Sequence, residues 1–177
     1  MNIYSKIMQT GMALVALCGL TSCPYEHYDG GDGYYEPIYM TRPELEASVR
    51  FDSAQPLYSA GKIYVRAHQL FICEPYKGVH VIDNSNPQKP RPTDFIAIPG
   101  CVDVAVRGNI LYADNAVDLV AVDLDQRKVV AREQNAFKSI VPPNVGWWWG
   151  DSEEGSGKII VGFVKKESRS SNYSISK

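Results

Sequence analysis

The chain has 177 residues, with 18 lysines and arginines against 20 aspartates and glutamates, and a formal net charge of −2 at pH 7. This balance provides no basic surface, so nothing in the composition indicates a nucleic-acid partner. The length suits one domain that can bury a hydrophobic core.

The first 22 residues are typical of an export signal. Lys6 supplies an early positive charge, and "GMALVALCGL" supplies an apolar segment too short to span a bilayer as a mature helix. "LTSC" follows and resembles the bacterial lipobox, which implies cleavage before Cys23 and acylation of that cysteine. The resemblance predicts an anchor in the cell outer membrane, with the protein on its periplasmic side or exposed at the surface. The alternative is an ordinary secretory signal with a chance cysteine.

Residues 23–40 are rich in glycine, tyrosine and acidic residues and have no period of two or 3.6 residues. Such a segment indicates a tether between the membrane and a folded domain. Its acidic residues Glu26, Asp29, Asp32 and Glu36 resemble the acidic stretch behind the lipidated cysteine of surface-exported lipoproteins of Bacteroidetes. The alternative is a solvated linker with no further role.

From residue 41 the pattern changes to short strands. Thr41 is a candidate cap for a short turn before "ASVRF". Segments rich in Val, Ile, Tyr and Ala then recur between Gly, Pro, Asn and Asp turns, at a spacing of roughly 8–12 residues. They are "GKIYVRA", "QLFICE", "GVHVID", "TDFIAIPG", "CVDVAVRG", "NILYAD", "DLVAVDL", "KVVARE" and "GKIIVGFV". No stretch has a long helical period, so the sequence predicts an all-β protein.

Two windows of the chain match at an offset of 40 residues. "HQLFICEPYKGVHVID" (68–83) lies over "GNILYADNAVDLVAVD" (108–123) without a gap, and Asp83 meets Asp123. A period near 40 residues with about four strands per unit is that of β-propeller blades. Because each aspartate ends a strand and precedes a turn, we predict that both carboxylates bind the backbone of that turn.

The repeated segments "GVHVIDNSNPQKP" and "DLVAVDL" resemble the LVIVD repeat, and roughly residues 38–137 are similar to LVIVD-repeat lipoproteins of Bacteroidetes. The resemblance implies a propeller-like β fold and an envelope location, and it carries no catalytic residues. We therefore expect a β-repeat domain over 41–166, with blade-like units at about 61–100 and 101–137, a partial third unit at 138–166 and a frayed polar tail at 167–177. Because two and a half units cannot close a propeller, the expected fold is an incomplete or open one, unless copies of the chain associate.

Candidates for chemistry are few. His27 lies in the tether, His68 lies at a turn, and alternation places His80 on the solvent side of a strand. The runs "DNSN" (83–86) and "DNAVD" (114–118) lack the glycine and the closing glutamate of a calcium loop. We predict no catalytic residue, no bound metal and no cofactor.

Cys73 and Cys101 both lie in apolar contexts. In an exported protein they form either a disulfide or two free buried thiols, and the sequence leaves both alternatives open.

Trp147, Trp148 and Trp149 in "GWWWGD" are the most unusual local feature. Three consecutive tryptophans cannot all face one side of a strand, so at least one is expected to be exposed. Exposed tryptophan forms contact platforms for glycans and for proteins, whereas the alternative is packing over a sheet edge.

Together these features predict a non-catalytic, lipid-anchored module of the cell envelope that binds a protein or a glycan. The alternatives are a structural accessory subunit of an envelope assembly and a propeller-type enzyme.

Overall fold

The computed structural model describes residues 34–142 and 157–166. Strands hold 55% of these residues and one short helix holds 4%, in several antiparallel sheets of which none is closed. The all-β class predicted from the sequence is therefore confirmed. The predicted signal, Cys23, the tryptophans and the polar tail lie outside the described residues.

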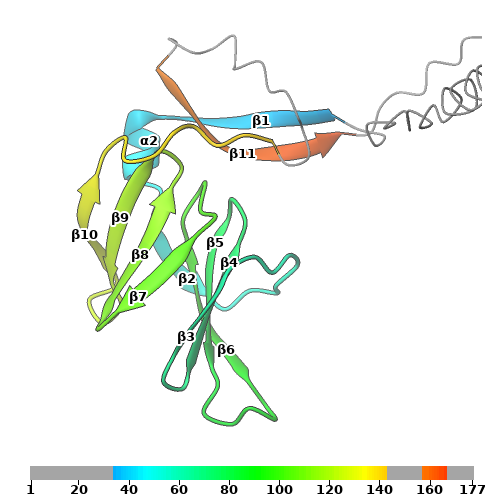
Figure 1. Cartoon of the computed structure of the whole chain (residues 1–177), viewed down its shortest axis with the longest axis vertical. Helices are drawn as coiled ribbons and strands as arrows, with labels where there is room; N and C mark the ends of the chain where they lie inside the picture. Colours follow the sequence, from blue (N-terminus) through cyan, green and yellow to red (C-terminus); the bar gives the residue numbers. More distant parts are fainter. Residues whose placement is uncertain (1–33, 143–156, 167–177) are drawn as a thin grey trace, which may run out of the picture. The chain divides into compact units, whose positions relative to one another are not determined.

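The first sheet has five antiparallel strands in the order β2-β6-β5-β4-β3 (Figure 1). Four of them follow one another along the chain, and β2 pairs with β6 at the edge, with Arg50 opposite Ala97. Gly78 begins β5 with a φ of 147°, and a Cβ there would lie 2.1 Å from the Ile96 carbonyl oxygen, so only glycine fits. The strands are β2 Arg50–Ser53, β3 Ile63–Arg66, β4 Gln69–Glu74, β5 Gly78–Asp83 and β6 Arg91–Ala97.

The second sheet has four antiparallel strands in the order β10-β9-β8-β7 (Figure 1). Its central hairpin turns through only two residues, because Asn115 pairs directly with Asp118. Ala116 has a left-handed φ of 58° in this turn, as the first central position of a tight hairpin requires. The strands are β7 Val104–Arg107, β8 Ile110–Asn115, β9 Asp118–Asp123 and β10 Lys128–Glu133.

A separate two-stranded ribbon joins the two ends of the described chain. Strand β1 (Tyr34–Thr41) pairs antiparallel with β11 (Lys158–Lys166). This differs from the sequence analysis, which assigns residues 34–40 to the tether and 158–166 to a partial third unit. The backbone partner that makes β1 a strand lies more than a hundred residues away in sequence, so no local pattern reveals the pairing.

The helix α2 (Arg42–Glu46) follows β1 directly. Glu44 Oε2 accepts hydrogen bonds from the backbone nitrogen of Thr41 at 2.7 Å and from its hydroxyl at 2.8 Å. The predicted cap at Thr41 is therefore confirmed, and Glu44 completes it in the manner of a capping box.

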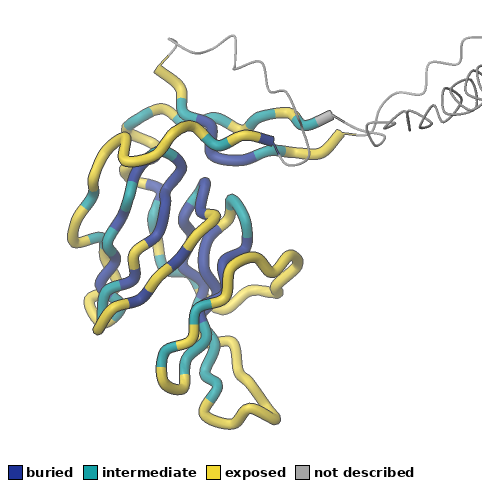
Figure 2. Tube along the Cα trace, in the orientation of Figure 1, coloured by how far each residue is buried: buried dark blue, intermediate teal, exposed yellow. Residues whose placement is uncertain are grey.

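The main core lies between the two larger sheets. Buried residues alternate with exposed ones along β7, whereas the buried residues of β4 and β5 follow one another without a break (Figure 2). Phe71 and Val81 of the first sheet and Leu111 and Val122 of the second belong to one continuous buried cluster. Alternation with a period of two brings these residues to a single face of each sheet. The two sheets are therefore held together face to face by apolar burial.

A buried polar network joins the helix to the second sheet. The Asp118 carboxylate has no solvent exposure, and Arg42 Nη1 donates to both of its oxygens at 2.7 Å. Arg132 Nη1 donates to Oδ2 at 2.7 Å and to Asn115 Oδ1 at 2.8 Å. Burial alone would raise the pKa of Asp118, but the hydrogen bonds from Arg42, the Asn135 backbone and Arg132 outweigh it and lower the pKa.

We expect Asp118→Ala to lower the free energy of unfolding by about 3–5 kcal/mol, because it leaves Arg42 and Arg132 partly enclosed without their shared anion. Urea denaturation followed by circular dichroism measures this change. Asp125→Ala removes an exposed carboxylate near the end of the same hairpin and should change the value by less than about 0.5 kcal/mol. Equal effects of the two substitutions would contradict the role given to Asp118.

Candidate functional site

The strongest candidate site is a groove of about 420 Å³ on the face of the second sheet that points away from the main core. We call it the outer groove. Its floor comes from strands β7 to β9, and its walls come from the segments before β7 and after β10. It is lined by Val102, Asp103, Val104, Ala105, Tyr112, Ala113, Asp114, Ala116, Leu119, Phe137, Lys138 and Ile140.

Strand alternation produces the floor of the outer groove. Ala105 pairs with Tyr112 across β7 and β8, one position out of phase with the core pair Val104 and Ala113. The wall is fixed by the backbone, because the Phe137 nitrogen donates to the Val117 carbonyl oxygen at 2.9 Å. The groove is thus a formed feature of the sheet and its neighbouring segment.

The lining of the outer groove is mainly apolar, with exposed aromatic surface. Tyr112 is 37% exposed, Phe137 46% and Val102 41%. Large apolar side chains that stay exposed together are typical of a contact surface rather than of a solvated face.

One carboxylate in the lining of the outer groove, that of Asp114, positions a wall of the groove. Asp114 accepts hydrogen bonds from the backbone nitrogens of Val102 and Asp103 at 2.8–3.0 Å, which holds the segment before β7 in place. Burial raises the pKa of Asp114, and these backbone hydrogen bonds offset the rise only in part. Asp114 therefore shapes the groove through its backbone hydrogen bonds, and the surface left for a ligand is mainly apolar.

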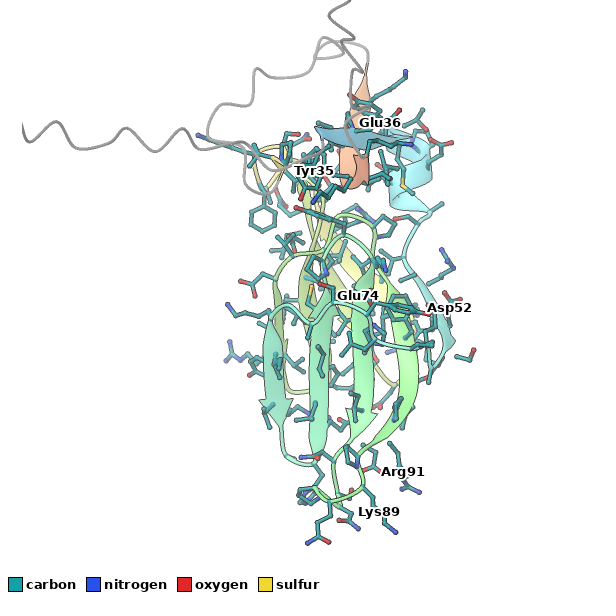
Figure 3. The ribbon with its side chains drawn as sticks, turned by 90° about the vertical axis from the view of Figure 1, so that its right-hand side faces the viewer. Tyr35, Glu36, Asp52, Glu74, Lys89 and Arg91 are labelled. Atoms are coloured by element: carbon teal, nitrogen blue, oxygen red, sulfur yellow. The ribbon has the colours of Figure 1, made fainter. Side chains whose placement is uncertain are left out.

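A second cluster lies on the first sheet, on the face opposite the main core. Glu74 Oε2 lies 2.8 Å from His80 Nε2, and Lys77 Nζ donates to Glu74 Oε1 at 2.6 Å. Figure 3 shows Glu74 at the end of the sheet remote from Lys89 and Arg91.

The predicted solvent position of His80 is wrong. Its side chain is only 3% exposed and its ring lies 4.7 Å from that of Phe95. Alternation correctly places it opposite the core valines, but this second face of the sheet is covered as well. Because the Glu74 carboxylate and the His80 imidazole are both enclosed, a substrate cannot reach them. We therefore infer that the pair has a structural role.

The two aspartates singled out in the sequence bind turns, as predicted. Asp83 Oδ1 accepts from the Ser85 backbone nitrogen at 2.9 Å. Asp123 Oδ1 accepts from the backbone nitrogens of Asp125 and Gln126 at 3.0 and 2.8 Å. Both carboxylates end a strand and satisfy the following turn, so the prediction is confirmed.

The two calcium-like runs have their carboxylates committed to other partners. Asp83 binds the turn and Arg91, Asp114 binds backbone nitrogens, and Asp118 binds two arginines. Within residues 34–142 and 157–166, no three His, Cys, Asp or Glu side chains gather as metal ligands would.

Cys73 and Cys101 are both buried, with their sulfur atoms 3.5 Å apart and unbridged. Cys23 and the contact surface expected at Trp147, Trp148 and Trp149 lie outside the described residues. Across the part of the chain that the structure describes, no helix has the length and apolar character needed to cross a bilayer.

The outer groove is not among the sites predicted from the sequence. A signal for it was present, because "ILYADN" and "DLVAVD" carry apolar residues at both odd and even positions. A strand with one solvated face would alternate apolar and polar residues, whereas apolar residues on both faces predict a partner on both sides.

We expect Glu74→Gln to change how stability depends on pH. Burial raises the Glu74 pKa, but hydrogen bonds from Lys77 and His80 leave it below the ordinary 4.5. An acid with a lowered folded pKa contributes stability above its unfolded pKa and loses it as pH falls through the folded value. At pH 6 the free energy of unfolding of the variant should therefore be about 1–3 kcal/mol lower than that of the natural protein. At pH 3 this difference in free energy should be smaller.

Urea denaturation at pH 6 and at pH 3 measures the difference in free energy of unfolding at each pH. Glu133→Gln, at an exposed position, is the matched control. A gap that stays constant between pH 6 and pH 3 would show that ionised Glu74 is not held by its partners.

The sequence matches no model of a known protein family, no curated protein and no solved structure at a significant level.

Proposed function

We propose that the protein is a lipid-anchored β-repeat protein of the cell envelope that acts as a non-catalytic binding module. The outer groove is the observation that carries the binding role, because it is an apolar, partly exposed surface built from ordered strands. The signal-like residues 1–22 and the lipobox-like "LTSC" carry the envelope location.

We further propose that the two larger sheets are blade-like units of an open, propeller-like array. Their four consecutive strands begin at Ile63, Gln69, Gly78 and Arg91 in the first sheet and at Val104, Ile110, Asp118 and Lys128 in the second. The offsets are 41, 41, 40 and 37 residues. The change from 41 to 40 arises in the central turn, which holds three residues in the first sheet and two in the second.

The strand pairings support this proposal, because they show that the two sheets pack through non-equivalent faces. By ladder position, the pair Leu70 and Ile82 corresponds to the pair Leu111 and Val122. The first pair faces away from the main core, whereas Leu111 and Val122 face into it. The faces that the two sheets turn toward the main core are therefore opposite faces by ladder position. Successive blades of a propeller pack on each other in this way.

By the same correspondence, the outer groove lies on the face of the second sheet that is equivalent to the core face of the first sheet. A further sheet in the array would cover this face. Phe71 packs into the core between the sheets, and its counterpart by ladder position is Tyr112 in the floor of the groove. A surface that corresponds to a sheet-packing face is suited to the apolar side chains of a protein. This favours a protein segment over a glycan as the ligand. A segment of a second copy of the chain is one such protein ligand.

We expect Leu119→Arg to weaken ligand binding at least tenfold, because it places a charge in the apolar floor of the outer groove. Purified protein is applied to an array of short peptides with apolar residues at alternate positions, and in parallel to a glycan array. Val130→Arg, which charges an exposed position outside the groove, is the matched control and should bind as the natural protein does.

Melting followed by circular dichroism confirms that both variants are folded before binding is compared. Peptide binding lost only in Leu119→Arg supports the proposal. Binding confined to glycans, or binding unchanged by Leu119→Arg, would place the contact surface elsewhere. Light scattering over a concentration series tests self-association through the same face.

The lipid anchor gives a second test. We expect cells that express the protein to label it with a fatty-acid analogue, because the lipobox-like sequence directs acylation to the thiol of Cys23. Cys23→Ala should abolish the label and release the protein from the membrane fraction. Cys18→Ala, which changes a cysteine within the apolar segment, should leave the label in place. Label that survives Cys23→Ala would contradict the predicted anchor.

A further inference from the structure

Two thiols face each other in the main core, where neither has solvent exposure. Cys73 lies on β4, and Cys101 lies in the connector between β6 and β7, 28 residues later. Their sulfur atoms are 3.5 Å apart. Cys101 Sγ also lies 3.5 Å from the carbonyl oxygen of Asp103, a lining residue of the outer groove, and neither cysteine belongs to the polar network around Asp118.

The backbone holds both cysteines in place. The nitrogen and the carbonyl oxygen of Cys73 bind the segment before β3, through Lys62 and Gly61, each at 2.8 Å. The carbonyl oxygen of Cys101 accepts from the Tyr76 nitrogen at 2.7 Å, in the turn after β4. The approach of the two thiols is therefore a consequence of strand and turn geometry rather than of side-chain flexibility alone.

Gly100 makes this arrangement possible. It has a φ of 81°, and a Cβ at this position would lie 2.6 Å from the Ala116 backbone nitrogen. Its own nitrogen donates to the Tyr76 carbonyl oxygen at 3.1 Å. Only glycine fits such a close approach with a left-handed backbone, so the connector carries Cys101 toward β4 at a fixed place.

We propose that Cys73 and Cys101 are joined by a disulfide bond in the exported protein, which ties the first sheet to the connector that leads into the second. Sulfur atoms in a disulfide lie about 2.05 Å apart, so the two must approach by roughly 1.5 Å. Rotation of the two side chains within the packed core can supply this movement, while the backbone hydrogen bonds stay in place.

The reaction needs a disulfide donor, such as oxidised glutathione or a thiol–disulfide oxidoreductase. One cysteine thiolate attacks the donor, forms a mixed disulfide and releases the first donor thiol. The second cysteine thiolate attacks the protein sulfur of that mixed disulfide and releases the second donor thiol. The two protein thiols thus lose two protons and two electrons, and the donor disulfide is reduced to two thiols.

The bond forms while the chain folds. In the folded protein the neighbouring Cys73 thiol, burial and the Asp114 carboxylate raise the pKa of the Cys101 thiol. Because the thiolate is the attacking species, exchange in the closed core is slow. A donor reaches both cysteines before the two sheets pack against each other.

The test uses the full chain, reduced and unfolded, then refolded in a glutathione redox buffer. After acid quenching, alkylation in denaturant and tryptic digestion, we expect one linked pair, the peptide 67–77 with the peptide 78–107. The same buffer applied to reduced, already folded protein should form this bond at least tenfold more slowly. Two alkylated peptides after refolding, or a link to Cys18 or Cys23 instead, would overturn the proposal.

The stability change provides an independent readout. Reduction of the linked protein should lower the melting temperature by on the order of 10 °C, as expected for a bridge that closes a loop of this length. The matched Cys73→Ala and Cys101→Ala variants should show no dependence on reductant, and a drop of the same size in either would contradict the pairing. In the cell, the disulfide donor is available only if the protein is exported as proposed. The refolding test adds glutathione directly, so its result does not depend on the export proposal.

Discussion

The buried carboxylate of Asp118 determines how the parts of the described chain join. A carboxylate without solvent must be compensated by donors, and here these donors come from Arg42 after β1, from Arg132 on β10 and from the Asn135 backbone. Its presence at the start of β9 therefore holds the helix and the outermost strand of the second sheet at one point. The β1–β11 ribbon gains its position in the same way, since β1 runs directly into the residue that binds Asp118.

The different burial of the two outward faces is the second feature that shapes the structure. His80 shows its effect on the first sheet, where the face opposite the main core encloses an acid–imidazole pair with its hydrogen bonds satisfied. Tyr112 shows it on the second sheet, where the equivalent coverage is incomplete and an apolar groove remains. The outward faces of the two sheets thus differ in burial, enclosed at His80 in the first sheet and partly exposed at Tyr112 in the second.

The sequence predicted what local pattern controls. The strands between Ile63 and Glu133 lie where β-branched and aromatic segments end in turn residues, and Asp83 and Asp123 bind their turns. It did not predict the β1–β11 pairing or the partners of Asp118, because these contacts join residues far apart in the chain. The outer groove cannot be predicted in this way, because apolar residues on both faces of β8 and β9 indicate strands but do not show which face stays open.

The offset of 40 residues illustrates how a repeat in sequence can differ from a repeat in structure. It aligned Phe71 with Leu111, and both are buried in the main core, so their likeness follows from sharing one environment. Position in the ladder instead aligns Phe71 with Tyr112, one residue further on, because the central turn of the second sheet is one residue shorter. Since a shift of one residue exchanges the two faces of a strand, only the ladder shows that the face of Tyr112 in the second sheet corresponds to the core face of Phe71 in the first. Among the described residues, the face that carries Tyr112 forms the outer groove, so the length of one hairpin turn separates a core position in the first sheet from a partly exposed position in the second.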